Sequence, residues 1–177
     1  MLPADGGSQP VPRLKDVSFQ RLMALQIGDP APEFTLPDQD GNPVSLSQLK
    51  GKRVVIYFYP KDDTPGCTKE ACNFRDQWSA FENHAITVLG ISKDAAGSHA
   101  KFIAKYSLPF TLLSDAEPCP VATAYGSYGL KKFMGKEYLG MMRHTFVVDG
   151  EGRLEKIFTK VKAETMADDI LSELGLA

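Results

Sequence analysis

Two cysteines separated by four residues form the part of this sequence best suited to chemistry. They lie in the stretch "YFYPKDDTPGCTKEAC", which runs from Tyr57 to Cys72. In this stretch Thr64 and Pro65 precede Cys67, and a hydroxyl residue followed by proline is typical of the N-cap and first position of a helix. We therefore expect the Cys67 thiol in the first helical turn, beside unpaired backbone N–H groups and the positive end of the helix dipole. These groups favour the thiolate, which is the nucleophilic form of cysteine.

The helical spacing of the two cysteines predicts that their thiols point apart. Cys67 shares the apolar stripe of the helix with Ala71, Phe74, Trp78 and Phe81. Cys72 lies about 140° around the helix from Cys67 and about 8–9 Å away between Cα atoms. A disulfide needs Cα atoms within about 6.8 Å, so the two cysteines can bond only after the helix unwinds locally.

Other uses of these cysteines fit the sequence less well. A metal site is not predicted, because C-x4-C is a wide spacing and His84, His99 and His144 form no pair at ligand spacing. A disulfide reductase of the thioredoxin type would need cysteines only two residues apart. An inert binding module with a thioredoxin fold is a further alternative, although such a module would not need Thr64, Cys67 and Arg143 together. Cys119, between two prolines, is interpreted as a bystander.

Composition limits the possible classes of protein. The chain has 177 residues, is 43% hydrophobic and carries a formal net charge of −2, with no basic run that would favour nucleic acid as a partner. It lacks the apolar segment of about 20 residues that a membrane helix needs, and its start does not resemble a secretory signal. Three cysteines do not suggest a disulfide framework. We expect a protein of the cytoplasm, with no contact with membranes and no metal or other cofactor.

The arrangement of apolar runs predicts one α/β domain. Residues 1–26 are interpreted as an extension, poorly ordered or lightly docked, and residues 27–177 as the domain. The runs "VVIYFY", "TVLGIS" and "FTLLSD" alternate with helical patterns, which indicates parallel central strands with helices on both faces. The stretch "HTFVVDGEGRLEKIF" predicts an antiparallel hairpin at one edge, and "AETMADDILSELG" a final helix.

The segment "YPKDDTPGCTKEAC" resembles the active-site segment of peroxiredoxins. The family pattern Pro-x3-Thr/Ser-x2-Cys is met by Pro60, Thr64 and Cys67, and a second cysteine five residues on, here Cys72, is similar to the bacterioferritin comigratory protein or peroxiredoxin Q subgroup. The resemblance covers nearly all of residues 27–177. It implies a thioredoxin-like fold, in which helices flank a central mixed β-sheet and a β-hairpin is added at the N-terminal side.

The resemblance also implies a function and a division of roles. It implies a monomer or weak dimer that reduces hydrogen peroxide and organic hydroperoxides and is recycled by thioredoxin or a glutaredoxin-type reductant. Cys67 would be the peroxidatic cysteine, and Cys72 the resolving cysteine that forms an intramolecular disulfide with it. The arginine of the family motif falls at Arg143, which would stabilise the breaking O–O bond.

Two neighbours of Cys67 have both a structural and a functional interpretation. Thr64 would cap the helix, and the resemblance implies that its hydroxyl also contacts the sulfur and the peroxide. Pro60 would end the preceding strand and shield the thiolate from water. The residues between them, 61–63, are interpreted as a solvated loop. The segment "KKFMGKEYLGMM" is interpreted either as an exposed apolar rim, where peroxide tails or a reductant dock, or as a plain loop.

Overall fold

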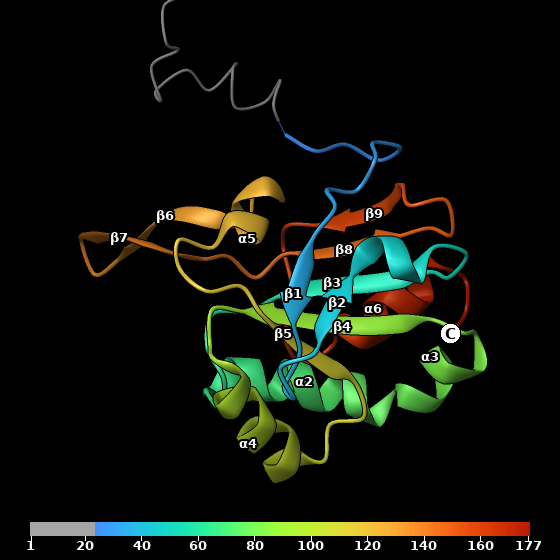
Figure 1. The fold of residues 1–177 in the computed structure, drawn as a ribbon, viewed down its shortest axis with the longest axis horizontal. Coiled ribbons are helices and arrows are strands. Elements are labelled where there is room, and N and C mark those ends of the chain that lie inside the picture. The colour runs from blue at the N-terminus through green and yellow to red at the C-terminus, as the bar shows by residue number, and fades with distance from the viewer. Residues whose placement is uncertain (1–23) are drawn as a thin grey trace, which may run out of the picture.

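The computed structural model describes residues 24–177, so the predicted extension over residues 1–26 lies almost entirely outside the described residues. A central sheet of five strands organises the described part, in the spatial order β5-β4-β3-β8-β9 (Figure 1). Its strands are β3 (Val54–Phe58), β4 (Thr87–Ser92), β5 (Thr111–Ser114), β8 (Thr145–Val148) and β9 (Leu154–Phe158).

The sheet is mixed, as the sequence predicted. Strand β3 pairs in parallel with β4, and β4 in parallel with β5. On its other side β3 pairs antiparallel with β8, which forms the predicted edge hairpin with β9. All five residues of β3 are buried, because this strand lies at the centre of the sheet and is covered on both faces.

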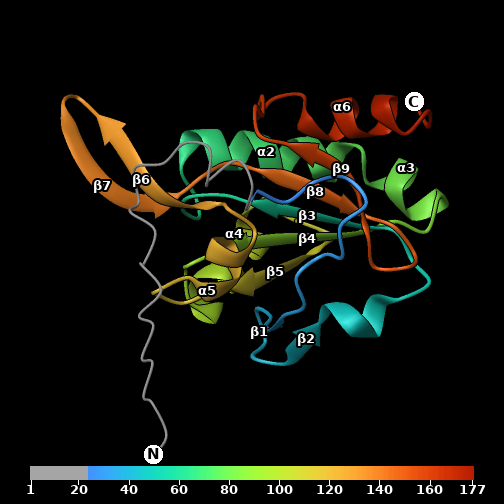
Figure 2. The same ribbon diagram turned by 90° about the horizontal axis from the view of Figure 1, so that it is seen from above.

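The longer helices gather on one face of the sheet. They are α2 (Pro65–Asp76), α3 (Trp78–Asn83), α4 (Ala96–Tyr106) and α6 (Met166–Glu173). Their buried side chains join one apolar cluster with those of the sheet, and Figure 2 shows α2 and α6 lying over β3 and β8. Both crossovers, from β3 to β4 and from β4 to β5, move in the same direction, so right-handed connections place α2 and α4 on the same side.

The opposite face is covered mainly by the N-terminal hairpin. This hairpin consists of β1 (Thr35–Pro37) and β2 (Pro43–Ser45), and it is joined by the 3-10 helix η1 (Leu46–Leu49) and the short helix α5 (Pro120–Ala124). A second apolar cluster lies beneath these elements. The sequence predicted helices on both faces of the sheet. On the face covered by the β1–β2 hairpin, only the short helices η1 and α5 fulfil that prediction.

The segment interpreted as a rim or a loop is a two-stranded hairpin that projects from the body of the protein (Figures 1 and 2). Its strands are β6 (Tyr128–Phe133) and β7 (Lys136–Met141). The hairpin exposes several large apolar side chains, namely Leu130, Phe133, Met134, Tyr138 and Leu139. It is therefore an apolar rim in its composition, with the regular pairing of a hairpin.

The helix that carries Cys67 is shorter than the apolar stripe suggested. It ends at Asp76, and Gln77 separates it from α3. Cys67, Ala71, Phe74 and Phe81 are buried as predicted, whereas Trp78 is only partly buried.

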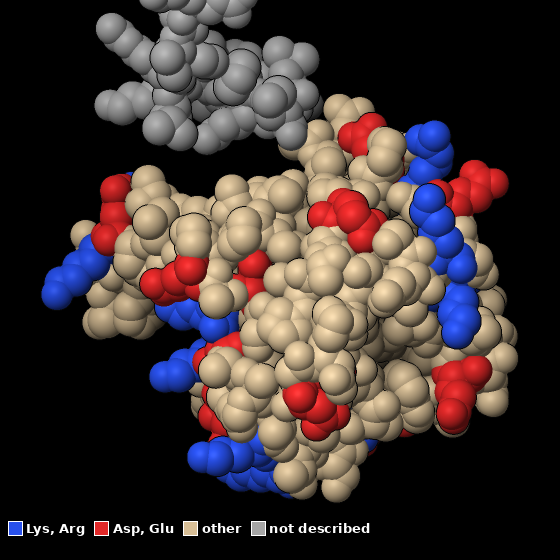
Figure 3. Space-filling model, in the orientation of Figure 1, with Lys and Arg blue, Asp and Glu red and all other residues tan. Residues whose placement is uncertain are grey.

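None of the helices within residues 24–177 combines the length and apolar character that crossing a bilayer requires. On the face seen in Figure 3, acidic and basic side chains are mixed.

Candidate active site

Cys67 lies beyond the carboxyl end of β3, the central strand of the sheet. The chain leaves β3, passes Pro60 and enters α2 at Pro65, where the backbone N–H of Thr68 donates to the Thr64 carbonyl at 2.8 Å. Cys67 thus lies in the first turn of the helix, as predicted, with only 2% of its surface exposed. The α2 N-terminus directs unpaired N–H groups towards this region, which favours negative charge on the sulfur.

Arg143 contacts the sulfur of Cys67 directly. Its Nη2 lies 3.2 Å from Sγ, and its Nη1 donates to Glu70 Oε1 at 3.2 Å. Arg143 lies between β7 and β8, and the next residue, His144, accepts a hydrogen bond from the Phe58 N–H through its carbonyl at 2.9 Å. The sheet therefore fixes the backbone beside Arg143, and Glu70 fixes the orientation of its guanidinium.

Gly66 keeps space open for this guanidinium. A Cβ atom at position 66 would lie 3.3 Å from Nη2 of Arg143. That distance is tighter than an ordinary van der Waals contact, so a larger residue would push the guanidinium away from the sulfur.

Glu70 is a part of the site that the sequence analysis missed. Its side chain is fully buried, and Oε2 has no hydrogen-bond partner among residues 24–177. Burial raises the pKa of Glu70 to about 7, although the nearby Arg143 opposes the shift. Its position one helical turn after Cys67 was the available signal, since residues at i and i+3 share a helix face.

Tyr57 closes the site from the sheet side. Its ring stacks on Phe74 with 4.7 Å between centroids, and its hydroxyl has no hydrogen-bond partner in the described part of the chain. Burial raises the pKa of Tyr57 well above its ordinary value, and the negative charges of Glu70 and Cys67 raise it further. Tyr57 therefore stays protonated, with its hydroxyl buried near Gly90 of β4.

Thr64 occupies the N-cap position but does not cap the helix with its side chain. Its hydroxyl donates to the Lys61 carbonyl at 2.9 Å instead, which closes the loop before the helix. The predicted capping hydrogen bond is therefore wrong, while contact with the sulfur and the peroxide stays a prediction. Pro60 is half-buried and lies two residues after the end of β3, where a shielding role for its ring also stays a prediction.

The loop between Pro60 and Thr64 is only partly solvated. Lys61 and Asp63 are exposed as predicted, but Asp62 is 7% exposed and its carboxylate accepts hydrogen bonds from other buried groups. The interpretation of residues 61–63 as a uniformly solvated loop was wrong at Asp62, because its partners lie far away in the sequence.

The other two cysteines differ in their surroundings. All three thiols are free, with Cys72 half-buried and Cys119 buried. Burial raises the pKa of Cys119 to about 11, so its thiol stays protonated near neutral pH. This agrees with its interpretation as a bystander.

Comparison with known proteins now supplies the family. Residues 27–157 match the profile of the AhpC/TSA family. Peroxiredoxin Bcp of Bacillus subtilis is 46% identical over 152 residues, which cover 86% of this chain and 96% of the relative. Peroxiredoxin Bcp of Escherichia coli is 45% identical over 150 residues, which cover 85% of this chain and 96% of the relative. The chain belongs to the AhpC/TSA family of peroxiredoxins.

Solved structures of similar proteins agree with the assignment of this chain to the peroxiredoxins. Peroxidoxin BcpB from Mycobacterium tuberculosis matches with a TM-score of 0.75 and 37% identity, covering 85% of this chain and 97% of the other. A bacterioferritin comigratory protein from Xanthomonas campestris, described for its alkyl peroxide reduction, matches with a TM-score of 0.75 and 35% identity, covering 80% and 90%. The thioredoxin-like fold is confirmed, and the chain is a thiol-dependent peroxidase that uses a peroxide and a thiol reductant.

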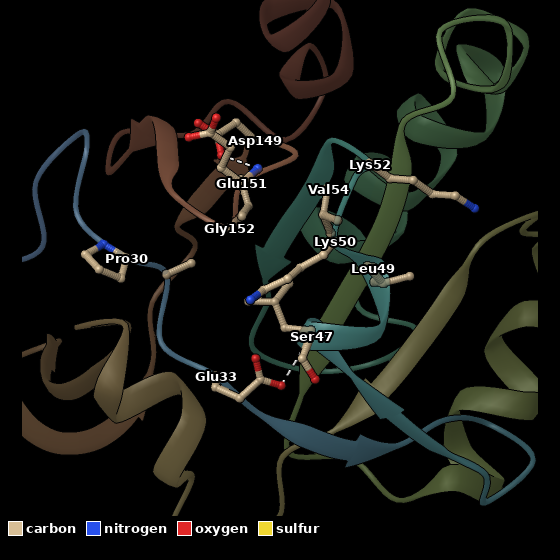
Figure 4. A pocket seen from close by; sticks show the side chains of 13 residues that line it. Pro30, Glu33, Ser47, Leu49, Lys50, Lys52, Val54, Asp149, Glu151 and Gly152 are labelled. Carbon is tan, nitrogen blue, oxygen red and sulfur yellow. Dashed lines mark hydrogen bonds between the residues drawn. The ribbon is translucent and has the colours of Figure 1, made fainter.

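A pocket in this peroxiredoxin lies at the other end of β3 from Cys67 (Figure 4). Lys50 and Lys52, which precede β3, line it together with Glu33 and Ser47, whose backbone N–H donates to the Glu33 carboxylate at 3.0 Å. It contains none of the predicted site residues. Within residues 24–177, no group of three or more His, Cys, Asp or Glu side chains is placed to hold a metal ion.

Proposed function

We propose that Cys67 is the peroxidatic cysteine of this peroxidase and Cys72 its resolving cysteine. The observation that carries the proposal is the 3.2 Å contact between Arg143 Nη2 and the Cys67 sulfur at the start of α2. A fixed cation and a helix N-terminus beside one thiol favour its thiolate. Cys72 and Cys119 have no such contact among the described residues.

The first chemical step is attack of the Cys67 thiolate on the terminal oxygen of a hydroperoxide. The S–O bond forms as the O–O bond breaks, Cys67 becomes a sulfenic acid, and the other oxygen leaves as hydroxide or alkoxide and takes a proton to give water or an alcohol. Sulfur is oxidised by two electrons and the peroxide is reduced by two. Hydrogen peroxide and organic hydroperoxides are the proposed substrates.

Arg143 stabilises the charge that moves from sulfur to the leaving oxygen. Its planar guanidinium presents several N–H donors. Nη1 donates to Glu70, which fixes the orientation of the guanidinium, and Nη2 faces the sulfur of Cys67. Thr64 would contact the sulfur and the peroxide through its hydroxyl after releasing the Lys61 carbonyl. Pro60 would shield the thiolate from water.

The second step returns the sulfenic acid to the thiol. The Cys72 thiol attacks the sulfur of the sulfenic acid, water leaves, and an intramolecular Cys67–Cys72 disulfide forms. Thioredoxin or a glutaredoxin-type reductant then supplies two electrons by thiol–disulfide exchange and restores both thiols.

We further propose a monomer or weak dimer in the cytoplasm, formed by one domain over residues 27–177. One chain supplies Cys67, Cys72, Glu70 and Arg143, so the proposed chemistry needs no second subunit. A cycle that passes through two free thiols suits a compartment in which thiols are kept reduced.

Replacing each cysteine in turn tests the assignment. We expect Cys67→Ser to abolish peroxide reduction with the fold intact, because a hydroxyl of similar size does not ionise here. Cys119→Ser is the matched control and should retain turnover, since its thiol is buried and stays protonated. Peroxide consumption by the reduced proteins, followed by a count of free thiols, provides the measurement. Substantial turnover by Cys67→Ser would refute the assignment.

A further inference from the structure

A second buried polar cluster includes a residue of the loop between β3 and α2 and has no role in the chemistry described so far. At its centre the carboxylate of Asp62 meets the imidazole of His99, with Nδ1 2.8 Å from Oδ2. The His99 side chain is fully buried, and that of Asp62 is 4% exposed. The two residues are 37 positions apart and come from the loop before α2 and from α4.

Both ring nitrogens of His99 lie within hydrogen-bond distance of oxygen atoms. Its Nε2 lies 3.0 Å from the Leu113 carbonyl oxygen, which can only accept a hydrogen bond. Asp62 already accepts from the Tyr59 hydroxyl at 2.6 Å and from the Ser98 hydroxyl at 2.7 Å, as an ionised carboxylate does. Both ring nitrogens of His99 therefore face oxygen acceptors, and Nδ1 also lies 3.3 Å from the Tyr59 hydroxyl.

The same cluster fixes the backbone of the loop that leads to Cys67. The Asp62 N–H donates to Asp94 Oδ2 at 2.9 Å, and Asp94 also accepts from the Ser92 hydroxyl at 2.7 Å. Asp62 is thus held at its side chain by α4 and by Tyr59, and at its backbone by the segment after β4. Cys67 follows it by five residues, through the turn that the Thr64 hydroxyl closes.

We propose that His99 is a positioning residue for Cys67: as a buried imidazolium, it holds the Asp62 carboxylate and thereby fixes the loop that aims Cys67 at Arg143. The inference rests on the proposed role of Cys67. It assigns a function in catalysis to an ion pair that touches neither the sulfur nor the peroxide.

The groups that hydrogen-bond to this pair come from three neighbouring parts of the fold. Tyr59 approaches from the residue after β3, Ser98 from α4 and the Leu113 carbonyl from β5. Asp94, Lys101 and Lys105 are further charged groups nearby, on the backbone of Asp62 and in the adjoining pocket. Burial by itself raises the pKa of Asp62, but hydrogen bonds from His99, Tyr59 and Ser98 outweigh it and hold this pKa below its usual value. A pocket opens beside the Asp62–His99 pair and gives water access to the Asp62 side. It is lined by Asp62, Asp63, Ser98, Lys101, Phe102 and Lys105.

The test compares His99→Gln with His84→Gln, a matched control at an exposed histidine. Glutamine keeps a donor for one acceptor but cannot carry the charge or serve both acceptors. We expect hydrogen exchange at residues 61–64 to speed up in His99→Gln. We also expect oxidation of Cys67 by hydrogen peroxide to slow by roughly tenfold or more, because small misplacements of a reacting group are costly. His84→Gln should match the wild type in both measurements.

Nitrogen NMR of the wild-type protein tests the charge directly and needs no peroxide. Signals of a doubly protonated His99 ring at pH 7 are expected, and a neutral ring would overturn the inference even if Cys67 is the peroxidatic cysteine. An unchanged oxidation rate in folded His99→Gln would also overturn it, because a purely structural histidine would lower the thermal midpoint without changing that rate. If His99→Gln does not fold, Ser98→Ala removes one donor to Asp62 and should slow the oxidation about threefold, whereas an unchanged rate would again overturn the inference.

Discussion

The guanidinium of Arg143 lies 3.2 Å from the sulfur of Cys67, although 76 residues separate the two along the chain. The same guanidinium is held by Glu70, which is one helical turn from Cys67 on α2. One cation thus links a thiol and a carboxylate that the same helix presents. Both anionic groups compete for its charge, so the protonation of Glu70 affects how strongly Arg143 stabilises the thiolate.

Arg143→Lys should slow oxidation of Cys67 by more than tenfold although it keeps the positive charge. A lysine ammonium is a single point charge, and it cannot bind Glu70 and the sulfur through two separate donors in a fixed plane. The second-order rate constant with hydrogen peroxide is the quantity to measure. Arg153→Lys is the control, because Arg153 donates to the Gly28 carbonyl, away from Cys67. Equal rate constants for Arg143→Lys and the wild type would exclude this role.

Glu70→Gln should change how protein stability depends on pH. The pKa of Glu70 is raised from 4.5 to about 7 in the folded protein, so between these values the folded state binds more protons than the unfolded state. Its contribution to the free energy of unfolding is therefore largest below about pH 4.5 and falls as the pH rises towards 7. The full change is on the order of 3 kcal/mol.

The difference in the free energy of unfolding between the wild type and Glu70→Gln isolates the contribution of Glu70. Burial lowers the pKa of His144, which gives the opposite slope over part of the range, but this contribution is common to both proteins and cancels. Denaturant unfolding of both proteins between pH 4.5 and 7.5 provides the measurement. We expect the stability of the wild type relative to Glu70→Gln to decline across this window, and a constant difference would contradict the raised pKa.

The sequence was informative where local pattern determines structure. The buried run of β3 and the Thr-Pro start of α2 were enough to place Cys67 in the first turn on the inner face. Glu70 and Asp62 were missed because charged residues are usually exposed, and the exceptions need partners from elsewhere in the chain. Those partners, Arg143 and His99, are 73 and 37 residues away, and only the folded sheet brings them near.

Cys72→Ser should react once with peroxide and then stop. Without a second thiol the sulfenic acid on Cys67 persists, so turnover with thioredoxin is lost and excess peroxide drives Cys67 to sulfinic acid. Mass spectrometry of the protein after excess peroxide provides the measurement. The wild type, treated identically, should lose two thiols and gain no oxygen. If Cys67 gains no extra oxygen atoms in Cys72→Ser, another group resolves the sulfenic acid.

Formation of the Cys67–Cys72 disulfide should unwind only the first half of α2. In the intact helix the two Cα atoms are about 8–9 Å apart, and a disulfide requires less than about 6.8 Å. The second half is tied to α6, because the Asn73 side chain accepts from the Ala167 N–H at 2.6 Å and donates to Asp168 at 2.8 Å. Gln77 donates to the same Asp168 carboxylate at 2.7 Å. These bonds set a boundary for the unwinding at Asn73.

Hydrogen exchange on the reduced and oxidised proteins tests this boundary. Oxidation should remove protection from the amides of residues 68–76, whose carbonyl acceptors lie at residues 64–72 of the helix. The amide of Gln77 should stay protected, because it donates to the Asn73 carbonyl at 3.1 Å and opening it would also break the contacts with α6. In Asn73→Ala, which lacks both side-chain bonds to α6, the loss of protection on oxidation should extend to the amide of Gln77. Equal protection of residues 68–76 in both redox states of the wild type would mean that Cys72 does not bond to Cys67 of its own chain, since an intact helix keeps the two sulfurs apart.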